Sequence, residues 1–409
     1  MNKNSSIAII GGGIVGCAIA YELSTSGFTN ITVIERRGNI PGLNQSSTNE
    51  GTIHSGVYYL KDIMPLKATL CVKGNTLMYE FCEKHGIPYK KVGKLIIATN
   101  KKEETYLDFF LKVGTQNGVL GIKKISAKAA MQMEPNLSNI ISALYVPSAG
   151  STSPIALIKK IKKLAERNGV LFLLATTVMA INPGKDGFNI ITLTRGKTQT
   201  RSKDILINTA GLYADEVAKM VNPHVPYTIE PIRGEFFVYD KSIRKDVWMN
   251  GMHVYQPPYC YMTKNGQMKI LAVSAKKLPL VLKKGKVVIT AGIHLSPAYE
   301  EVNGKYVLRN MVTISPLKTS GIGKENYRSN LHKAKDYIEK ICYFFPHVKA
   351  RDLVPSHAGI MAVLKDHRDF IIERDKKFPN CINLVGMESP AWTSSLAIAK
   401  YVKNLINPD

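Results

Sequence analysis

The sequence lacks the features of a membrane-spanning, secreted or disulfide-bonded protein. No apolar run in its 409 residues approaches the roughly 18 residues that a membrane-spanning helix needs. The first predicted strand begins by Ile7, which leaves no room for a secretory signal. The six cysteines are dispersed without a C-x-x-C pair, which argues against a structural zinc site and a disulfide framework. We therefore expect a cytoplasmic protein with reduced thiols and no metal ion, long enough for two domains.

Acidic residues are scarce relative to basic ones. Lysine and arginine number 55 against 31 aspartates and glutamates, which gives a formal net charge of +24. This excess attracts anions such as a carboxylate substrate, a nucleotide, RNA or an anionic membrane, although lysines spread over a solvated surface give the same total. Lys276, Lys277, Lys283 and Lys284 flank the apolar residues 278–282. This segment is a candidate for peripheral membrane contact, and a plain strand with charged ends explains it equally well.

The most informative feature of the chain is a glycine-rich turn between a predicted strand and a predicted helix. Residues 7–10 form an apolar run typical of a central parallel strand, and a G-x-G-x-x-G motif follows at Gly11, Gly13 and Gly16. The first glycine permits the tight turn, and the second lets the backbone approach a pyrophosphate. The third lets helix and strand pack closely, so that the helix N-terminus meets the anion.

An acidic residue follows the next predicted strand. Residues 31–34 form this strand, and Glu35 directly after it is placed to accept hydrogen bonds from the ribose hydroxyls of an adenosine. A G-x-G-x-x-G motif alone is weak, but strand, glycines, helix, second strand and acid together predict a dinucleotide-binding site.

The rest of the chain does not continue as alternating strands and helices. Residues 86–99 and 226–308 are rich in β-branched and aromatic residues interrupted by glycine, proline and asparagine, which predicts antiparallel strands. Helices at 154–168 and 394–406 and strands at 170–178, 204–209 and 381–385 are expected to return to the nucleotide-binding unit. The predicted fold is α/β, with a discontinuous Rossmann-type domain (1–85, 150–222 and 352–409) and an antiparallel-sheet substrate domain (86–149 and 223–351).

Longer motifs resemble one family of flavoproteins. They begin with residues 45–59, QSSTNEGTIHSGVYY, and residues 66–74, LKATLCVKG. Further matches cover nearly the whole chain, at residues 93–98, 208–215, 232–235, 357–360, 368–371 and 386–396. Together they resemble the L-2-hydroxyglutarate dehydrogenase/oxidase branch of the glycine-oxidase-like flavoproteins, in the D-amino-acid oxidase superfamily. The resemblance implies a glycine-oxidase-like fold and FAD, rather than NAD, as the dinucleotide.

The resemblance also suggests where FAD binds. The polar cluster at residues 46–49 suits pyrophosphate and ribityl oxygens, although four polar residues in a row also make an ordinary loop. Val178 matches a family position whose backbone contacts adenine, and the helix N-terminus near residues 386–395 can face the flavin pyrimidine. The predicted FAD contacts are Gly11, Gly13, Ile14, Val15, Gly16, Glu35, Arg36, Ser46, Ser47, Thr48, Asn49, His54, Ser55, Val178, Ala210, Gly211, Gly386, Met387, Glu388, Ser389, Trp392 and Thr393.

Two residues are candidates for chemistry on a 2-hydroxy acid, which loses a hydride from its α-carbon while its hydroxyl loses a proton. His54, which the resemblance puts beside the isoalloxazine ring, is the natural base, or else a structural donor packed under the flavin. Arg233 would hold the substrate carboxylate with its planar guanidinium, or it pairs with Glu235 or another acid.

Other predicted substrate contacts are less specific. Tyr259 and His294 lie on predicted substrate-domain strands, where a structural role explains each more simply. Met361 stands where the family usually has an arginine facing the substrate, and losing that cation, worth about 1.5–3 kcal/mol, weakens the case for a dicarboxylate. Trp392 stands where the family tends to have a leucine and would narrow the pocket near the flavin.

The sequence therefore predicts an FAD-dependent dehydrogenase or oxidase that acts on a small 2-hydroxy acid, with 2-hydroxyglutarate the leading candidate, and passes electrons to oxygen or a membrane quinone. An amino-acid or amine oxidase on the same scaffold is an alternative, because it needs the same flavin face. An RNA-binding flavoprotein is another, motivated by the charge. However, Lys159, Lys160, Lys162 and Lys163 recur at spacings typical of a solvated helix, so we expect no nucleic-acid partner.

Overall fold

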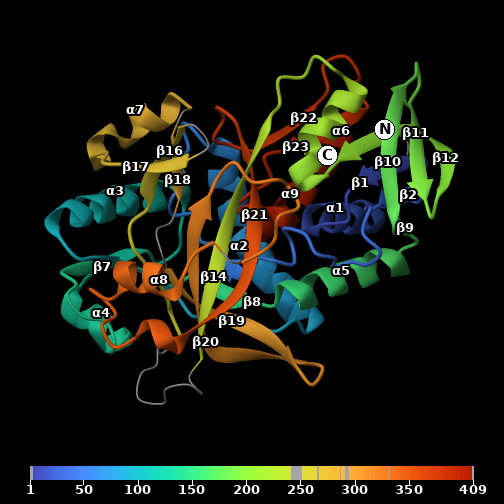
Figure 1. Ribbon diagram of the computed structural model, residues 1–409. Helices are drawn as coiled ribbons and strands as arrows, with labels where there is room; N and C mark the ends of the chain where they lie inside the picture. The colour runs from blue at the N-terminus through green and yellow to red at the C-terminus, as the bar shows by residue number, and fades with distance from the viewer. Residues whose placement is uncertain are drawn as a thin grey trace.

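The structure, a computed structural model, describes residues 3–240, 251–264, 267–285, 287–290, 294–329 and 331–407. Its elements form two regions, each centred on its own large sheet (Figure 1). Both ends of the chain lie beside the first region, on the right of Figure 1.

The first region is a six-stranded sheet. In spatial order its strands are β22 (Ile371–Arg374), β23 (Cys381–Val385), β13 (Ile205–Asn208), β1 (Ile7–Ile10), β2 (Ile31–Ile34) and β9 (Leu171–Leu173). The pairs from β23 to β9 are parallel, and only the β22–β23 pair is antiparallel. This is the dinucleotide-binding arrangement that the first 35 residues predict.

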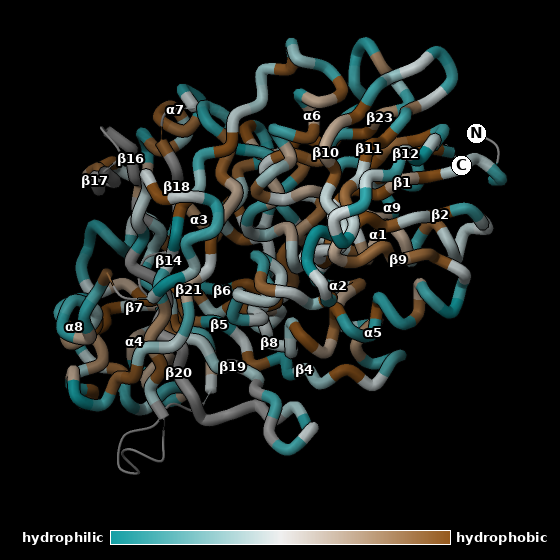
Figure 2. Tube along the Cα trace, turned by 45° about the vertical axis from the view of Figure 1, so that its right-hand side comes forward, coloured by the Kyte–Doolittle hydropathy of each residue, from teal (hydrophilic) through white to brown (hydrophobic). Residues whose placement is uncertain are grey.

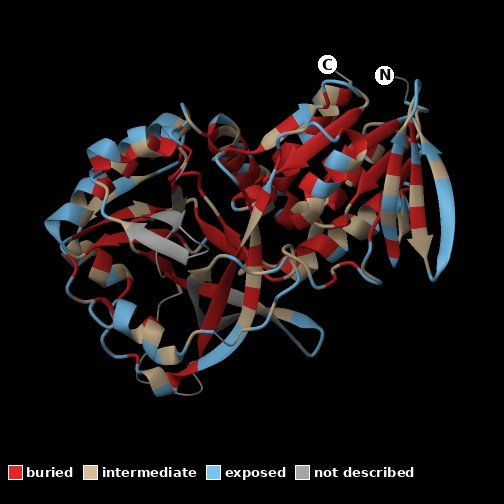
Figure 3. Ribbon diagram, turned by 45° about the horizontal axis from the view of Figure 1, so that its top comes forward, coloured by how far each residue is buried: buried red, intermediate tan, exposed pale blue. Residues whose placement is uncertain are grey.

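Both faces of this sheet are covered, which explains its continuous apolar strands. Ile7 and Ile9 pack into a core with the helices of one face, whereas Ala8 and Ile10 pack into a second core on the other face. The first face carries α1 (Ile14–Thr25), α2 (Pro65–His85), α5 (Pro154–Arg167) and α9 (Ala391–Ile406). The second carries α6 (Ala214–Val221) and a small sheet of β10 (Thr176–Pro183), β11 (Phe188–Thr194) and β12 (Lys197–Lys203). β12 is hydrophilic and exposed at the edge of the molecule (Figures 2 and 3).

The second region is an eight-stranded sheet, antiparallel except for the β15–β5 pair. Its order is β21 (Leu353–Leu364), β14 (Ile229–Asp240), β20 (Lys305–Thr319), β19 (His294–Val302), β15 (His253–Tyr255), β5 (Lys94–Ala98), β7 (Ser142–Val146) and β6 (Lys123–Ser126). Helix α3 (Lys101–Asn117) packs on one face, and α4 (Ala127–Met133) and α8 (Ala334–Ile341) pack on the other. The predicted α/β fold with an antiparallel second sheet is confirmed.

Smaller elements complete the fold. One three-stranded sheet contains β17 (Gln267–Leu271), β16 (Tyr259–Lys264) and β18 (Val288–Thr290), and another contains β3 (Thr52–Ile53), β8 (Gly150–Thr152) and β4 (Tyr89–Lys90). Among the described residues, no helix combines the length and apolar character needed to cross a membrane.

Some predicted elements differ from the structure. Residues 278–283 form helix α7 (Leu278–Lys283) rather than a strand, because Leu278 and Leu282 are buried at the four-residue spacing of one helix face. The predicted strand 170–178 is interrupted between β9 and β10.

β21 pairs with β14 in the second sheet, although the sequence assigned residues 352–409 to the first domain. Its burial alternates from Ala358 to Ala362, the pattern of an antiparallel strand. The other domain boundaries stay predictions.

Candidate active site

A cavity of about 340 Å³ lies where the first sheet meets the long strands of the second. Gly11, Glu35 and Ala210 line it, and these residues follow the carboxyl ends of β1, β2 and β13. The opposite wall includes residues of β14, β20 and β21. Ligands of open parallel sheets bind at the carboxyl ends of the strands, so the cavity lies where the sequence predicts the dinucleotide.

The glycine turn leaves no space for side chains. A Cβ on Gly11, whose φ is +108°, would lie 2.5 Å from the carbonyl oxygen of Thr209, and one on Gly16 would lie 2.0 Å from the carbonyl oxygen of Gly11. Gly13 lines the cavity just before α1, and that helix has no acidic residue in its first turn. The first turn of α1 therefore carries no carboxylate of its own that would repel a pyrophosphate.

Glu35 is held at the cavity wall by two backbone donors. Its Oε2 accepts a hydrogen bond from the N–H of Gly12 at 2.7 Å, and its Oε1 accepts one from the N–H of Arg37 at 2.8 Å. The side chain is buried, and the carboxylate retains lone pairs for a ribose. This arrangement fits the adenosine half of FAD.

A loop from the second region reaches this end of the cavity. Glu325 forms ion pairs with both Arg36 and Arg37, and it accepts a hydrogen bond from the hydroxyl of Tyr213 at 2.6 Å. Tyr327 of the same loop lines the cavity. The loop between β20 and α8 is thus joined to the first region beside Glu35.

Most of the contacts predicted for the polar segment at residues 46–49 are present in the cavity wall. Ser46, Thr48 and Asn49 line the cavity, and Ser46 Oγ accepts a hydrogen bond from the N–H of Ile14 at 2.9 Å. Ser47 does not line it, because its hydroxyl donates to the carbonyl oxygen of Gly42 within the loop.

The start of α9 closes another part of the cavity. Met387, Glu388, Ser389 and Trp392 line it, and the buried Nε1–H of Trp392 has no acceptor among the described residues. A buried donor without a partner is costly, so a ligand that accepts this hydrogen bond fits here. Together with the glycine turn and Glu35, this orphan donor shows that the residues present suit FAD.

The predicted FAD contacts divide into two groups. Ile14, Val15, Arg36, Ala210 and Gly211 line the cavity with those already described. The predicted contacts that do not line it are Gly16, Ser47, Ser55, Val178, Gly386 and Thr393. Of these, Thr393 supports a lining residue, because its hydroxyl accepts a hydrogen bond from the N–H of His54 at 3.0 Å and donates one to the carbonyl oxygen of Thr52.

His54 lines the cavity on a firmly held backbone. Its carbonyl oxygen accepts a hydrogen bond from the side chain of Asn75 at 2.9 Å, and its Nε2 lies 3.3 Å from Ser389 Oγ. Burial and the nearby positive charge of Lys94 hold the pKa of His54 well below its ordinary value. The imidazole is therefore neutral near pH 7 and has a nitrogen that can accept a proton.

A second histidine shares the cavity with a glutamate that the sequence did not single out. His294 Nε2 lies 2.9 Å from Glu50 Oε1, and the ring of His294 stacks on Tyr255 with centroids 4.0 Å apart. Burial would raise the pKa of Glu50, but the neighbouring His294 holds it below its usual range. Glu50 is therefore an anion within the cavity wall.

The predicted substrate contacts have different outcomes. His294 and Met361 line the cavity, whereas the side chain of Tyr259 lies outside the described residues. Lys318 at the end of β20 also lines the cavity and was missed. The only signal for Lys318 in the sequence is weak: it is a charged residue that directly follows an uncharged segment, residues 311–317.

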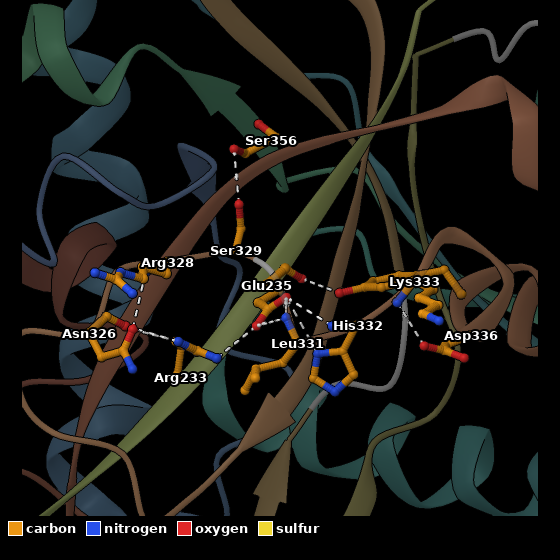
Figure 4. Close-up of polar contacts among 11 residues, drawn as sticks. Arg233, Glu235, Asn326, Arg328, Ser329, Leu331, His332, Lys333, Asp336 and Ser356 are labelled. Carbon is orange, nitrogen blue, oxygen red and sulfur yellow. Dashed lines mark hydrogen bonds and ion pairs between the residues drawn. The ribbon is translucent and has the colours of Figure 1, made fainter.

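Arg233 does not occupy the predicted position. Its side chain is 1% exposed and does not line the cavity. It donates from Nη2 to Glu235 Oε1 at 2.9 Å and from Nη1 to Asn326 Oδ1 at 2.8 Å, as Figure 4 shows. Glu235 also accepts hydrogen bonds from the backbone N–H groups of Leu331 and His332. The predicted carboxylate clamp is therefore wrong, because side chains alternate along β14 and the neighbouring Gly234 is the residue that lines the cavity.

Comparisons with known proteins agree on the family. The DAO family, described as FAD dependent oxidoreductase, matches residues 6–405. L-2-hydroxyglutarate dehydrogenase of Arabidopsis thaliana mitochondria is 27% identical, over 97% of this chain and 82% of that protein. Glycerol 3-phosphate dehydrogenase of Caloramator mitchellensis is 28% identical, over 98% of this chain and 73% of that protein.

Solved structures agree on the fold. L-alpha-glycerophosphate oxidase from Mycoplasma pneumoniae, with FAD bound, matches with a TM-score of 0.80 and 23% identity, over 100% of this chain and 95% of that chain. Glycine oxidase from Geobacillus kaustophilus matches with a TM-score of 0.75 and 18% identity, over 98% of this chain and 94% of that chain. The predicted glycine-oxidase-like fold is confirmed.

Proposed function

Because this chain belongs to the DAO family of FAD dependent oxidoreductases, we propose that it oxidises the hydroxyl-bearing carbon of a small 2-hydroxy acid, with a compound like 2-hydroxyglutarate as substrate. The enzyme class and the cofactor follow from the family. The substrate is the proposal, and L-2-hydroxyglutarate dehydrogenases at 26–29% identity support it.

The observation that carries the proposal is a neutral histidine in the cavity that suits FAD. When bound, FAD accepts a hydride from the substrate carbon. The substrate hydroxyl must lose a proton in the same oxidation, and His54 can accept it at a ring nitrogen because its lowered pKa keeps it unprotonated. The proton then resides on His54, and the substrate becomes a 2-keto acid.

The structure also offers His294 as a rival base. Its Nε2 already contacts Glu50 Oε1 at 2.9 Å. We prefer His54, because its lowered pKa leaves a ring nitrogen able to accept the proton and no carboxylate of the described residues is paired with that ring.

The electron acceptor is proposed to be oxygen or a membrane quinone. Peripheral contact with an anionic membrane is part of this proposal, and α7 supports it. Leu280 is 61% exposed on that helix, and Lys276, Lys277, Lys283 and Lys284 around it are exposed. An apolar tip within a ring of cations suits an anionic interface.

The experiment that tests the substrate is anaerobic bleaching of the purified holoenzyme. A panel of hydroxy acids, amino acids and glycerol 3-phosphate is added without oxygen, and the loss of the oxidised-flavin absorbance is followed. We expect a 2-hydroxy acid to bleach the flavin fastest. Bleaching by an amino acid or by glycerol 3-phosphate alone would contradict the proposed substrate and leave the family assignment intact.

A further inference from the structure

The basic residues that line the cavity have unequal partners. Arg36 and Arg37 are paired with Glu325, and Lys67 Nζ lies 2.6 Å from Glu388 Oε1. Arg368 donates from Nε to the carbonyl oxygen of Gly285 at 2.9 Å. The side-chain ammonium of Lys318 makes no hydrogen bond or ion pair with any residue in the described part of the chain. Among the cavity-lining lysines and arginines, Lys318 is thus the one whose side chain has no described hydrogen-bond or ion-pair partner. Arg368 also has no acidic partner among the described residues, but a carbonyl oxygen binds its guanidinium.

The strand register places Lys318 on the cavity face of the second sheet. Lys318 of β20 pairs with Gly234 of β14, and Gly234 pairs with Gly359 of β21. Paired residues of antiparallel strands share a face, and so do residues two apart on one strand, which adds Met361 to the same face. All four residues line the cavity. The two glycines put no side chain between Lys318 and Met361.

An unpaired ammonium in a partly buried site is unfavourable unless an anion arrives. Burial lowers the pKa of Lys318 to about 8, although the negative charges of Glu388 and Glu50 oppose the shift. Below that pH the side chain is mostly charged and can attract an anionic ligand, and above it the attraction is lost.

We propose that Lys318 binds the anionic group of the substrate remote from the carbon that is oxidised, and so determines the substrate class of this site. This assignment rests on the proposed function for the reaction itself, and it adds which residue binds the anionic group of the substrate. An ammonium is a point charge and does not require the planar, two-point geometry of a guanidinium. It therefore accommodates a carboxylate or a phosphate, and the substrate class is a small secondary alcohol that carries one of these groups.

The test measures binding of two anions that cannot be oxidised, glutarate and inorganic phosphate. Each is titrated into holoenzyme at pH 7, and the change in the flavin absorption spectrum gives a dissociation constant. We expect at least one of the two anions to bind the wild type. Lys318→Met should raise the dissociation constant of that anion about 10- to 100-fold. The anion that binds identifies the group as carboxylate or phosphate. Unchanged affinity in Lys318→Met, or no binding of either anion to the wild type, would overturn the proposal.

Two further variants separate charge from folding. Lys318→Arg should retain anion binding, and Lys318→Met combined with Met361→Arg should recover much of it, because the cation then enters the same face from β21. Lys163→Met removes one exposed positive charge from α5, outside the cavity, and should leave anion affinity unchanged. If neither Lys318→Arg nor the double variant binds the anion, although both have an intact flavin spectrum, the positive charge of Lys318 does not bind the anion.

The pH dependence provides an independent readout. In the wild type, the dissociation constant should rise as pH increases through about 8, where Lys318 loses its proton. Lys318→Arg should remove that rise, since arginine stays protonated. FAD affinity is measured in parallel: loss of FAD from Lys318→Met with normal anion affinity in the remaining holoenzyme would assign Lys318 to the cofactor instead. None of these measurements requires turnover, so they stand even if no 2-hydroxy acid bleaches the flavin.

Discussion

The two walls of the cavity are built in different ways. The glycine wall consists of the cavity-lining residues within 11–15, 35–37 and 44–54, short segments that follow one another closely along the chain. The strand wall includes Gly234, Tyr255, His294, Lys318 and Met361, each from a different strand of the second sheet. The glycine wall comes from neighbouring segments of the chain, whereas the residues of the strand wall are brought together only by strand pairing.

This difference assigns different tasks to the two walls. A dinucleotide is recognised largely by backbone groups and one acidic side chain, and a family can keep that recognition in a contiguous motif. Substrate recognition depends on individual side chains that can change without altering the fold. We therefore propose that the glycine wall holds the cofactor and that the strand wall determines which substrate is oxidised.

The largest effect should come from His54, the residue of the glycine wall that we assign to chemistry. Replacing His54 by Asn should leave FAD bound but slow anaerobic flavin reduction by the best substrate about 10²–10⁴-fold, because the proton acceptor is lost. Stopped-flow absorbance measures the rate. Ser389→Ala removes a neighbouring hydroxyl but keeps the imidazole, and its rate should fall much less.

The pH profile of the wild type sharpens this prediction. Burial and Lys94 lower the pKa of His54, so the base form predominates at neutral pH. Reduction should fall only as the pH drops below the ordinary histidine range near 6.5, and this acidic limb should disappear in His54→Asn. A His54→Asn holoenzyme reduced at the wild-type rate would show that His54 is not the base and would make His294 of the strand wall the next residue to test.

The sequence predicts the glycine wall well and the strand wall poorly, for a physical reason. Gly11, Gly13 and Glu35 are recognisable because backbone conformation and one carboxylate are required at fixed spacing. Lys318 and the contact of Glu50 with His294 could not be identified from the sequence, because both depend on which strands pair and in what register. The sequence leaves Arg233 open between a substrate carboxylate and Glu235, because the neighbouring residues do not indicate which side chains of β14 face the cavity; in the structure it pairs with Glu235.

A smaller effect is expected at Glu35, where the glycine wall holds the cofactor. Glu35→Ala should weaken FAD binding by about 1–3 kcal/mol, since the ribose loses its acceptor and the N–H of Gly12 loses its partner. Titration of apoprotein with FAD, followed by flavin fluorescence, measures this change. Glu35→Gln keeps an acceptor oxygen and should lie between the two. Equal FAD affinity in all three proteins would show that Glu35 only stabilises the turn.

The smallest effect should occur where the two regions are joined by Glu325. Arg36 and Arg37 pair with it, and all three side chains are between one-third and one-half exposed, so water and salt screen the contact. Because Tyr327 of the same loop lines the cavity, breaking this junction should loosen one side of the FAD site. Glu325→Gln should therefore speed FAD release about 2- to 5-fold at low ionic strength and much less in high salt.

Glu166→Gln, which breaks the exposed Lys162–Glu166 pair on α5, is the matched control and should release FAD at the wild-type rate. A faster release that persists unchanged in high salt would mean that Glu325 acts through the shape of the loop rather than its charge, and no change in either salt would mean that the glycine wall retains FAD without help from the second region.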